Sequence, residues 1–123
     1  MEENKENKNE KKPYDLEEIT FQFAERVRDY VKQLPRTTSN FEYGKQLLRS
    51  SGSQAANYIE ANESLGSKDF RMRIKICRKE SKESRMWLRL SEPLAIWEKD
   101  KSALLQESLE LTKIFGAILE RTK

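Results

Sequence analysis

The sequence contains no histidine and a single cysteine among its 123 residues. Without histidine it cannot form His-dependent metal sites or the Ser-His-Asp and Cys-His catalytic groups. One cysteine also excludes an intramolecular disulfide, and we interpret Cys77, which lies on an apolar stripe, as a small buried hydrophobic residue. These absences remove the reactive groups of most enzyme classes, so we predict no catalytic residue, no metal and no cofactor.

Long hydrophobic runs are also missing. The apolar stretch at residues 114–119 is far shorter than the roughly 20 residues that a transmembrane helix needs. The first twelve residues carry four acids and four lysines and lack the apolar core of a signal peptide. We therefore predict a cytoplasmic protein without a membrane partner, in which residues 1–13 form a disordered charged tail and residues 14–123 form one domain.

Only three prolines and four glycines interrupt the chain. Between them, apolar residues recur at helical spacing over about 15–34, 39–62, 67–91 and 102–121. No segment alternates apolar and polar residues as a half-buried strand does. The pattern predicts an all-α fold, an antiparallel up-and-down four-helix bundle.

The second predicted helix has an unusual middle. Ser39 and Glu42 match a capping box at its start. Residues 50–53 read Ser-Ser-Gly-Ser, poor helix formers whose small side chains would let a neighbouring helix approach closely. A break of the helix near Gly52 is the alternative. The core stripe of this helix is expected at Phe41, Leu48, Ala55 and Ile59.

The third predicted helix has apolar residues on two faces. Its core stripe follows a seven-residue repeat at Phe70, Ile74, Cys77, Ser81, Ser84, Leu88 and Ser91. A second set lies well away from that stripe and predicts an oligomer interface at Met72, Ile76, Trp87 and Leu90, flanked by Glu80 and Glu83. Alternatively, Trp87 covers the edge of the bundle beneath residues 94–97.

The remaining face of the third helix is basic. Residues 68–89 contain nine cations and three acids. Six of the cations are spaced by three or four residues and form one ridge, at Arg71, Lys75, Arg78, Lys82, Arg85 and Arg89. Because like charges at this spacing repel, the ridge predicts an anionic partner, with nucleic-acid phosphate as the obvious candidate. Alternatively, acids elsewhere in the bundle balance a solvated face.

Glutamates could offer one further kind of site. Glu80 and Glu83, with Glu107 and Glu110 on the fourth helix, would have to form an all-carboxylate metal site, because the glutamate-histidine pattern of di-iron bundles needs histidine. We prefer the interpretation that Glu80 and Glu83 pair with cations such as Arg73 or with a neighbouring subunit.

Several segments resemble one bacterial family. Residues 67–70 (SKDF) and 74–90 (IKICRKESKESRMWLRL) resemble the third-helix signature of the "four helix bundle protein" family, first noticed in intervening sequences of large-subunit ribosomal RNA genes. Residues 23–35, 46–61 and 107–114 resemble its other helices. The chain departs from the family at Ala55, where many relatives have proline, at Asn62, where they have glycine, and at Met86, where tyrosine is common.

The resemblance implies a small bacterial cytoplasmic protein without known catalysis, often a homopentamer built as a basic barrel. A distant relative, the accessory variability determinant of diversity-generating retroelements, binds nucleic acid. We therefore predict a non-enzymatic homo-oligomer that binds RNA or DNA, or a nucleic-acid enzyme, through the basic ridge. The alternative is a protein-protein scaffold with no nucleic-acid role.

Overall fold

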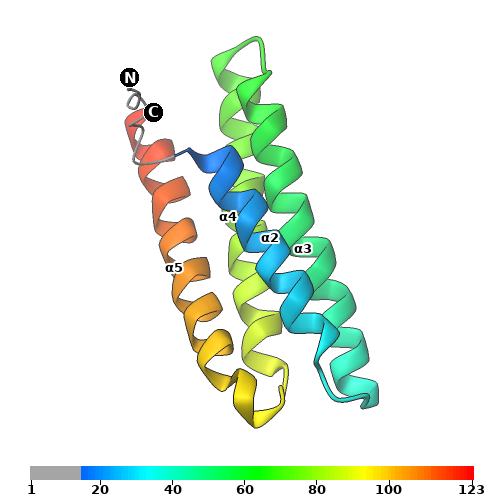
Figure 1. Ribbon diagram of the computed structural model, residues 1–123. Coiled ribbons are helices and arrows are strands. Elements are labelled where there is room, and N and C mark those ends of the chain that lie inside the picture. Colours follow the sequence, from blue (N-terminus) through cyan, green and yellow to red (C-terminus); the bar gives the residue numbers. More distant parts are fainter. Residues whose placement is uncertain (1–14) are drawn as a thin grey trace, which may run out of the picture.

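The computed structural model describes residues 15–123, and the predicted tail at residues 1–13 lies outside this range. Four long helices, α2 (Leu16–Lys32), α3 (Thr38–Asn62), α4 (Ser67–Leu90) and α5 (Glu98–Arg121), follow one another with a short 3-10 turn, η1 (Ala95–Trp97), before the last. Each helix runs antiparallel to the next, and α4 lies behind α2 between α3 and α5 (Figure 1). The prediction of an up-and-down four-helix bundle is confirmed.

The helix boundaries follow local capping, with some differences from the predicted ones. Asp15 accepts a hydrogen bond from the Glu18 amide and caps α2. In α3 the cap is Thr37, whose hydroxyl accepts from the Asn40 amide, and not Ser39, which lies inside the first turn. The helix begins earlier because Thr37, close after the stop at Pro35, already has the extended backbone of an N-cap.

Two further boundaries differ. The α5 helix begins at Glu98 and not near residue 102, because its first turn includes Glu98 and Asp100, whose charges complement the helix dipole. The α4 helix begins at Ser67, as predicted, but ends at Leu90, one residue before the predicted end. The α3 helix continues through Gly52 without a break, so that alternative is wrong.

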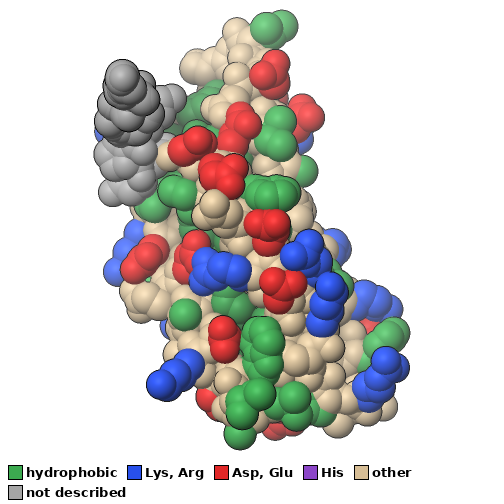
Figure 2. All heavy atoms as spheres, in the orientation of Figure 1, with side chains coloured by type: hydrophobic (Ala, Val, Ile, Leu, Met, Phe, Trp, Pro, Cys, Tyr) green, Lys and Arg blue, Asp and Glu red, His purple; other side chains and the backbone are tan. Residues whose placement is uncertain are grey.

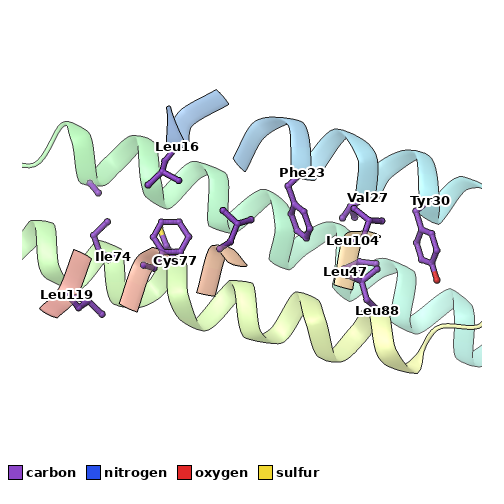
Figure 3. Packing of buried hydrophobic residues seen from close by; sticks show 13 residues of the cluster. Leu16, Phe23, Val27, Tyr30, Leu47, Ile74, Cys77, Leu88, Leu104 and Leu119 are labelled. Atoms are coloured by element: carbon purple, nitrogen blue, oxygen red, sulfur yellow. The ribbon is translucent and has the colours of Figure 1, made fainter. Parts of the chain in front are cut away.

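The hydrophobic core runs along the bundle (Figure 3), and small polar side chains are buried beside it. Ser50 and Ser84 hydrogen-bond at 2.7 Å between α3 and α4, and Ser81 donates to the Ser108 carbonyl of α5 at 2.8 Å. Small residues allow these backbones to approach closely, and each of these buried hydroxyls finds a partner. Ser50 and Ser51 therefore serve close packing, as one interpretation of the sequence predicted, whereas Gly52 is exposed.

The predicted core stripe of the second helix is wrong. Phe41, Leu48 and Ile59 are 67%, 43% and 49% exposed, and Ala55 is only half-buried. The face of α3 that turns inward is instead made largely of small and polar residues, namely Asn40, Gly44, Leu47, Ser50, Ser51, Gln54 and Ala61. Small residues occupy this face because α3 packs closely against both α2 and α4. A Cβ added to Gly44, for example, would lie 3.0 Å from Val31.

The other three predicted stripes are placed correctly. Phe23, Val27 and Tyr30 of α2 are fully buried, as are Ile74 of α4 and Phe115 of α5. Across residues 15–123, no helix is both long and apolar enough to traverse a lipid bilayer.

Candidate nucleic-acid interface

Different side chains of α4 face the core, the neighbouring helices and the solvent. Ile74, Cys77 and Leu88 point into the core, and α4 packs against both α3 and α5. The outward strip between these contacts carries the predicted basic ridge. Because α4 lies behind α2 in Figure 1, this strip is on the side turned away from the viewer.

The structure divides the six ridge residues into two groups. Four of them are exposed to solvent, at Lys75, Arg78, Lys82 and Arg89. They span 15 residues of one helix, and the 14 steps from the first to the last correspond to about 21 Å at 1.5 Å per residue. Among the described residues, no carboxylate lies within ion-pair distance of any of the six. Acids on the described part of the chain therefore do not neutralise the exposed row.

Arg71 and Arg85 are half-buried. The Arg71 guanidinium donates to the Leu119 carbonyl at 2.6 Å and to the Thr122 hydroxyl at 2.8 Å. It thus satisfies carbonyl and hydroxyl groups at the C-terminal end of α5, where a cation also complements the helix dipole. The Arg85 Nε is buried and has no partner within the described residues. Arg71 therefore has a structural role that the spacing of charges could not reveal.

A shallow hollow of about 440 Å³ lies on the ridge and is lined by Lys75, Arg78, Lys79, Lys82, Glu83 and Met86. Lys79 was outside the predicted ridge, yet it lines this hollow with three ridge cations. The Lys79 ammonium lies 3.9 Å from Glu80, whose carboxylate is shared with Arg49. The spacing of charges did not indicate Lys79, because it lies between the ridge and the face that packs on α3.

Glu80 and Glu83 belong to the seam between α3 and α4. Glu80 is 4% exposed and accepts hydrogen bonds from the Arg49 guanidinium at 3.3 and 3.4 Å and from the Ser53 hydroxyl at 3.2 Å. Glu83 accepts from the same guanidinium at 3.0 Å. Their cation within the chain is thus Arg49, while Arg73 donates to Asn57 instead. No described cluster of three or more metal-binding side chains accompanies them.

The predicted second apolar face of α4 likewise consists of two half-buried and two exposed residues. The Trp87 ring stacks on Tyr43 of α3, with ring centroids 6.0 Å apart, and its indole nitrogen is buried without a described partner. Ile76 is also half-buried, whereas Met72 and Leu90 are 47% and 45% exposed. Trp87 therefore packs within the chain against Tyr43 of α3, as the intramolecular alternative expected of this side chain in general.

Apolar residues are exposed on α2 and α3 as well as at Met72, Met86 and Leu90 of α4. Phe41, Leu48 and Ile59 of α3 are joined by Phe21 of α2, which is 53% exposed. Figure 2 shows the α2 and α3 side of the molecule, with acidic side chains most frequent in its upper half and Lys and Arg side chains in its lower half. Helical periodicity missed the α3 part of this face because it assigned Phe41, Leu48 and Ile59 to the core.

Burial raises the pKa of the Cys77 thiol to about 12. The thiol is fully buried and donates to the Gln54 carbonyl at 3.5 Å. Burial also raises the pKa of Tyr30, whose hydroxyl lies 2.7 Å from the Ser91 hydroxyl, and the pKa of Tyr58. These groups are protonated at neutral pH, and none of them lies on the basic ridge.

Comparison with known proteins agrees with this architecture. The chain is similar over 84% of its length to a solved protein of unknown function from the S23 ribosomal protein family of Bacteroides thetaiotaomicron, with 29% identity and a TM-score of 0.71. The match covers 96% of that protein. No curated protein sequence matches. The model of the 23S rRNA-intervening sequence protein family matches residues 14–117, and the chain belongs to this family.

Proposed function

We propose that this protein binds the phosphate backbone of RNA or DNA through the exposed cations of α4, as a non-catalytic homo-oligomer in the cytoplasm. The observation that carries the proposal is the exposed row Lys75, Arg78, Lys82 and Arg89, which has no ion-pair partner among the described carboxylates. A row of like charges on one helix is unfavourable unless a partner supplies the opposite charge. Nucleic-acid phosphates supply it at comparable spacing.

Binding of this kind depends on salt and little on sequence. Each neutralised phosphate releases counterions, so affinity falls steeply with ionic strength. The ridge offers lysine and arginine side chains without a base-reading module, which favours contacts to the backbone. Several copies in one oligomer would multiply weak contacts through effective concentration.

We expect random-sequence RNA or duplex DNA to bind with micromolar or tighter affinity at low salt, measured by fluorescence anisotropy. Charge reversal of Lys75, Lys82 and Arg89 to Glu should abolish binding of the duplex and weaken binding of the RNA. Single reversals should weaken duplex binding and lower its salt dependence, because removing the cation for one phosphate reduces the slope of log affinity against log salt by about 0.9 on B-form DNA.

The matched control reverses three exposed lysines outside the ridge, Lys99, Lys113 and Lys123, and changes the net charge equally. This control should retain most of the binding. An equal loss of affinity in both triple variants would show that only the net charge matters and would contradict the proposal. Binding whose affinity does not change with salt would contradict it as well.

A role as a protein scaffold is the second candidate. The exposed Phe21 and Ile59 on α2 and α3 favour it, since apolar side chains gathered on one face are typical of protein contacts. Co-purification of one protein at a fixed ratio, free of nucleic acid and lost in Ile59→Glu, would support the scaffold over the ridge proposal.

A further inference from the structure

A second hollow lies where α2 passes into α3, at the lower right in Figure 1. It encloses about 610 Å³, within the range of about 300–1,000 Å³ typical of small-molecule sites. Its apolar surface includes Leu34, Pro35, Phe41 and Leu48. The Phe41 side chain is 67% exposed, although an aromatic ring of this size is usually buried when it only serves packing.

Cations surround this apolar surface. Lys32, Arg36 and Lys45 line the hollow, and no acidic residue is among its described lining residues. The Lys45 ammonium lies 5.4 Å from the centroid of the Phe41 ring and 3.6 Å from the Glu42 carboxylate, the nearby acid that pairs with it. Figure 2 shows Lys and Arg side chains beside hydrophobic ones at this lower right part. The hollow therefore combines an aromatic face with an excess of positive charge.

The hollow is also held in place before any ligand binds. The Asn40 amide nitrogen donates to the Pro35 carbonyl at 3.0 Å and to the Glu92 carbonyl at 2.9 Å, while its oxygen accepts from the Glu92 amide at 2.9 Å. Asn40 thus ties the α2–α3 connection to the residues that follow α4. Gly44 lets α3 approach Val31 closely beside the hollow. A rigid surface of this kind loses little conformational entropy on binding.

We infer that this hollow binds one nucleotide unit, with its base stacked on Phe41 and its phosphate held by Arg36 and Lys45. A flat apolar ring next to a negatively charged group is the chemistry that an exposed aromatic side chain among cations recognises. The first turn of α3, which contains no acid, adds the positive end of its helix dipole at the same place. This site is separate from the α4 ridge and does not depend on the proposed function.

The ridge and the hollow differ in the nucleic acid that they fit. The ridge carries no aromatic side chain among its exposed cations, so it contacts phosphates alone and accepts a duplex. Stacking on Phe41 requires an unpaired base, because bases in a duplex are already stacked on their neighbours. The hollow therefore adds affinity for a single-stranded segment, for an unpaired end or for a free nucleotide.

The test compares two labelled probes by anisotropy at one salt concentration, an oligo-dT strand of about twelve nucleotides, within the site sizes of single-strand binders, and a blunt duplex. Phe41→Ala should weaken binding of the single strand about tenfold, the loss of one stacked base, and change duplex binding less than about twofold. The matched control is Phe21→Ala, which removes an exposed phenylalanine outside the hollow and should change neither. Arg36→Gln together with Lys45→Gln should weaken the single strand similarly.

Equal effects of Phe41→Ala and Phe21→Ala on the single strand would overturn the inference. A lower solution mass in Phe41→Ala would overturn it as well, because a second copy would then cover the hollow. Competition by AMP distinguishes a site for free nucleotides from one that needs a strand. If duplex binding is absent while single-strand binding depends on Phe41, the ridge proposal fails and the inference about the hollow stands. If the duplex binds while single-strand binding does not depend on Phe41, the inference about the hollow fails and the ridge proposal stands.

Discussion

Single residues in this protein have roles that their chemical type alone would not indicate. Arg71 matches the spacing of the basic ridge but binds the end of α5, and Glu80 is a carboxylate that is almost fully buried against Arg49 and Ser53. Both cases follow from the cost of leaving a buried polar group without a partner. The residue scale therefore decides which charges are available to a ligand.

Cys77 should behave as a reporter of unfolding. Because the thiol is buried and its pKa is raised from 9.0 to about 12, thiol reagents should modify it only when the bundle opens. In native protein at mildly alkaline pH, labelling by a chromogenic disulfide should be slow, and it should be complete within mixing time in urea. Rapid labelling of the native protein would show that the thiol is accessible.

The same shift makes stability fall at alkaline pH. The folded pKa lies above the unfolded one, so the stabilisation is complete below about pH 9 and is lost as pH rises toward 12. Between about pH 8 and about pH 10.5 this thiol should lower the free energy of unfolding by about 2 kcal/mol. In Cys77→Ala the fall measured by urea denaturation should be smaller by this amount, although Tyr30 and Tyr58 add a similar dependence above about pH 10 in both proteins.

Arg49 should be important for stability because it neutralises Glu80 in the α3–α4 seam. Arg49→Met leaves a carboxylate that is 4% exposed with a hydroxyl and the more distant Lys79, and should lower the free energy of unfolding by about 2 kcal/mol. The double variant Arg49→Met, Glu80→Gln should recover part of the loss in urea denaturation, because no buried charge then remains. An additive double variant would contradict this account.

At the scale of elements, α3 shows how packing overrules the size of side chains. Its inward face carries Gly44, Ser50 and Gln54, while Phe41 and Leu48 point outward. A helix that contacts two neighbours at short distance must place small residues between them. Gln54 is a larger polar residue on this face, and neither the oxygen nor the nitrogen of its side-chain amide has a hydrogen-bond partner among the described residues.

Two glycines of α3 should respond oppositely to the same substitution. Gly52→Ala meets nothing within 4 Å, so the higher helix propensity of alanine should raise the free energy of unfolding by about 1 kcal/mol. Gly44→Ala places its Cβ 3.0 Å from Val31 Cγ1, so the same gain should be cancelled or reversed. Urea denaturation of both variants checks this, and equal stabilisation by both would show that the α2–α3 contact is loose.

At the scale of the whole molecule, the association of several copies stays a prediction, and the exposed apolar side chains of α4 offer a surface on which to test it. Met72 and Leu90 of the predicted interface are about half exposed on α4, whereas Trp87 is engaged with Tyr43. Burying such residues against another subunit would remove apolar area from water at about 25 cal/mol per Å². The assembly, if it uses this face, should depend on the exposed pair and not on Trp87.

We expect Met72→Glu with Leu90→Glu to lower the mass in light scattering while circular dichroism still reports a helical bundle. Met86→Glu, at a residue of α4 that is 42% exposed and lies outside the predicted interface, is the matched control and should keep the wild-type mass. An unchanged mass in the double variant would move the interface elsewhere, with the exposed side of α3 as the next surface to test.

The amino-acid sequence alone determined the class of fold, three of the four core stripes and the basic ridge on α4. Helical periodicity, prolines and capping residues act over a few positions, so they can be read along the chain. Only the tertiary structure decided which face of α3 is buried, which ridge cations remain exposed and where an apolar hollow meets three cations. These features depend on how closely neighbouring helices approach and on which distant atoms satisfy a buried charge, and neither is encoded in local spacing.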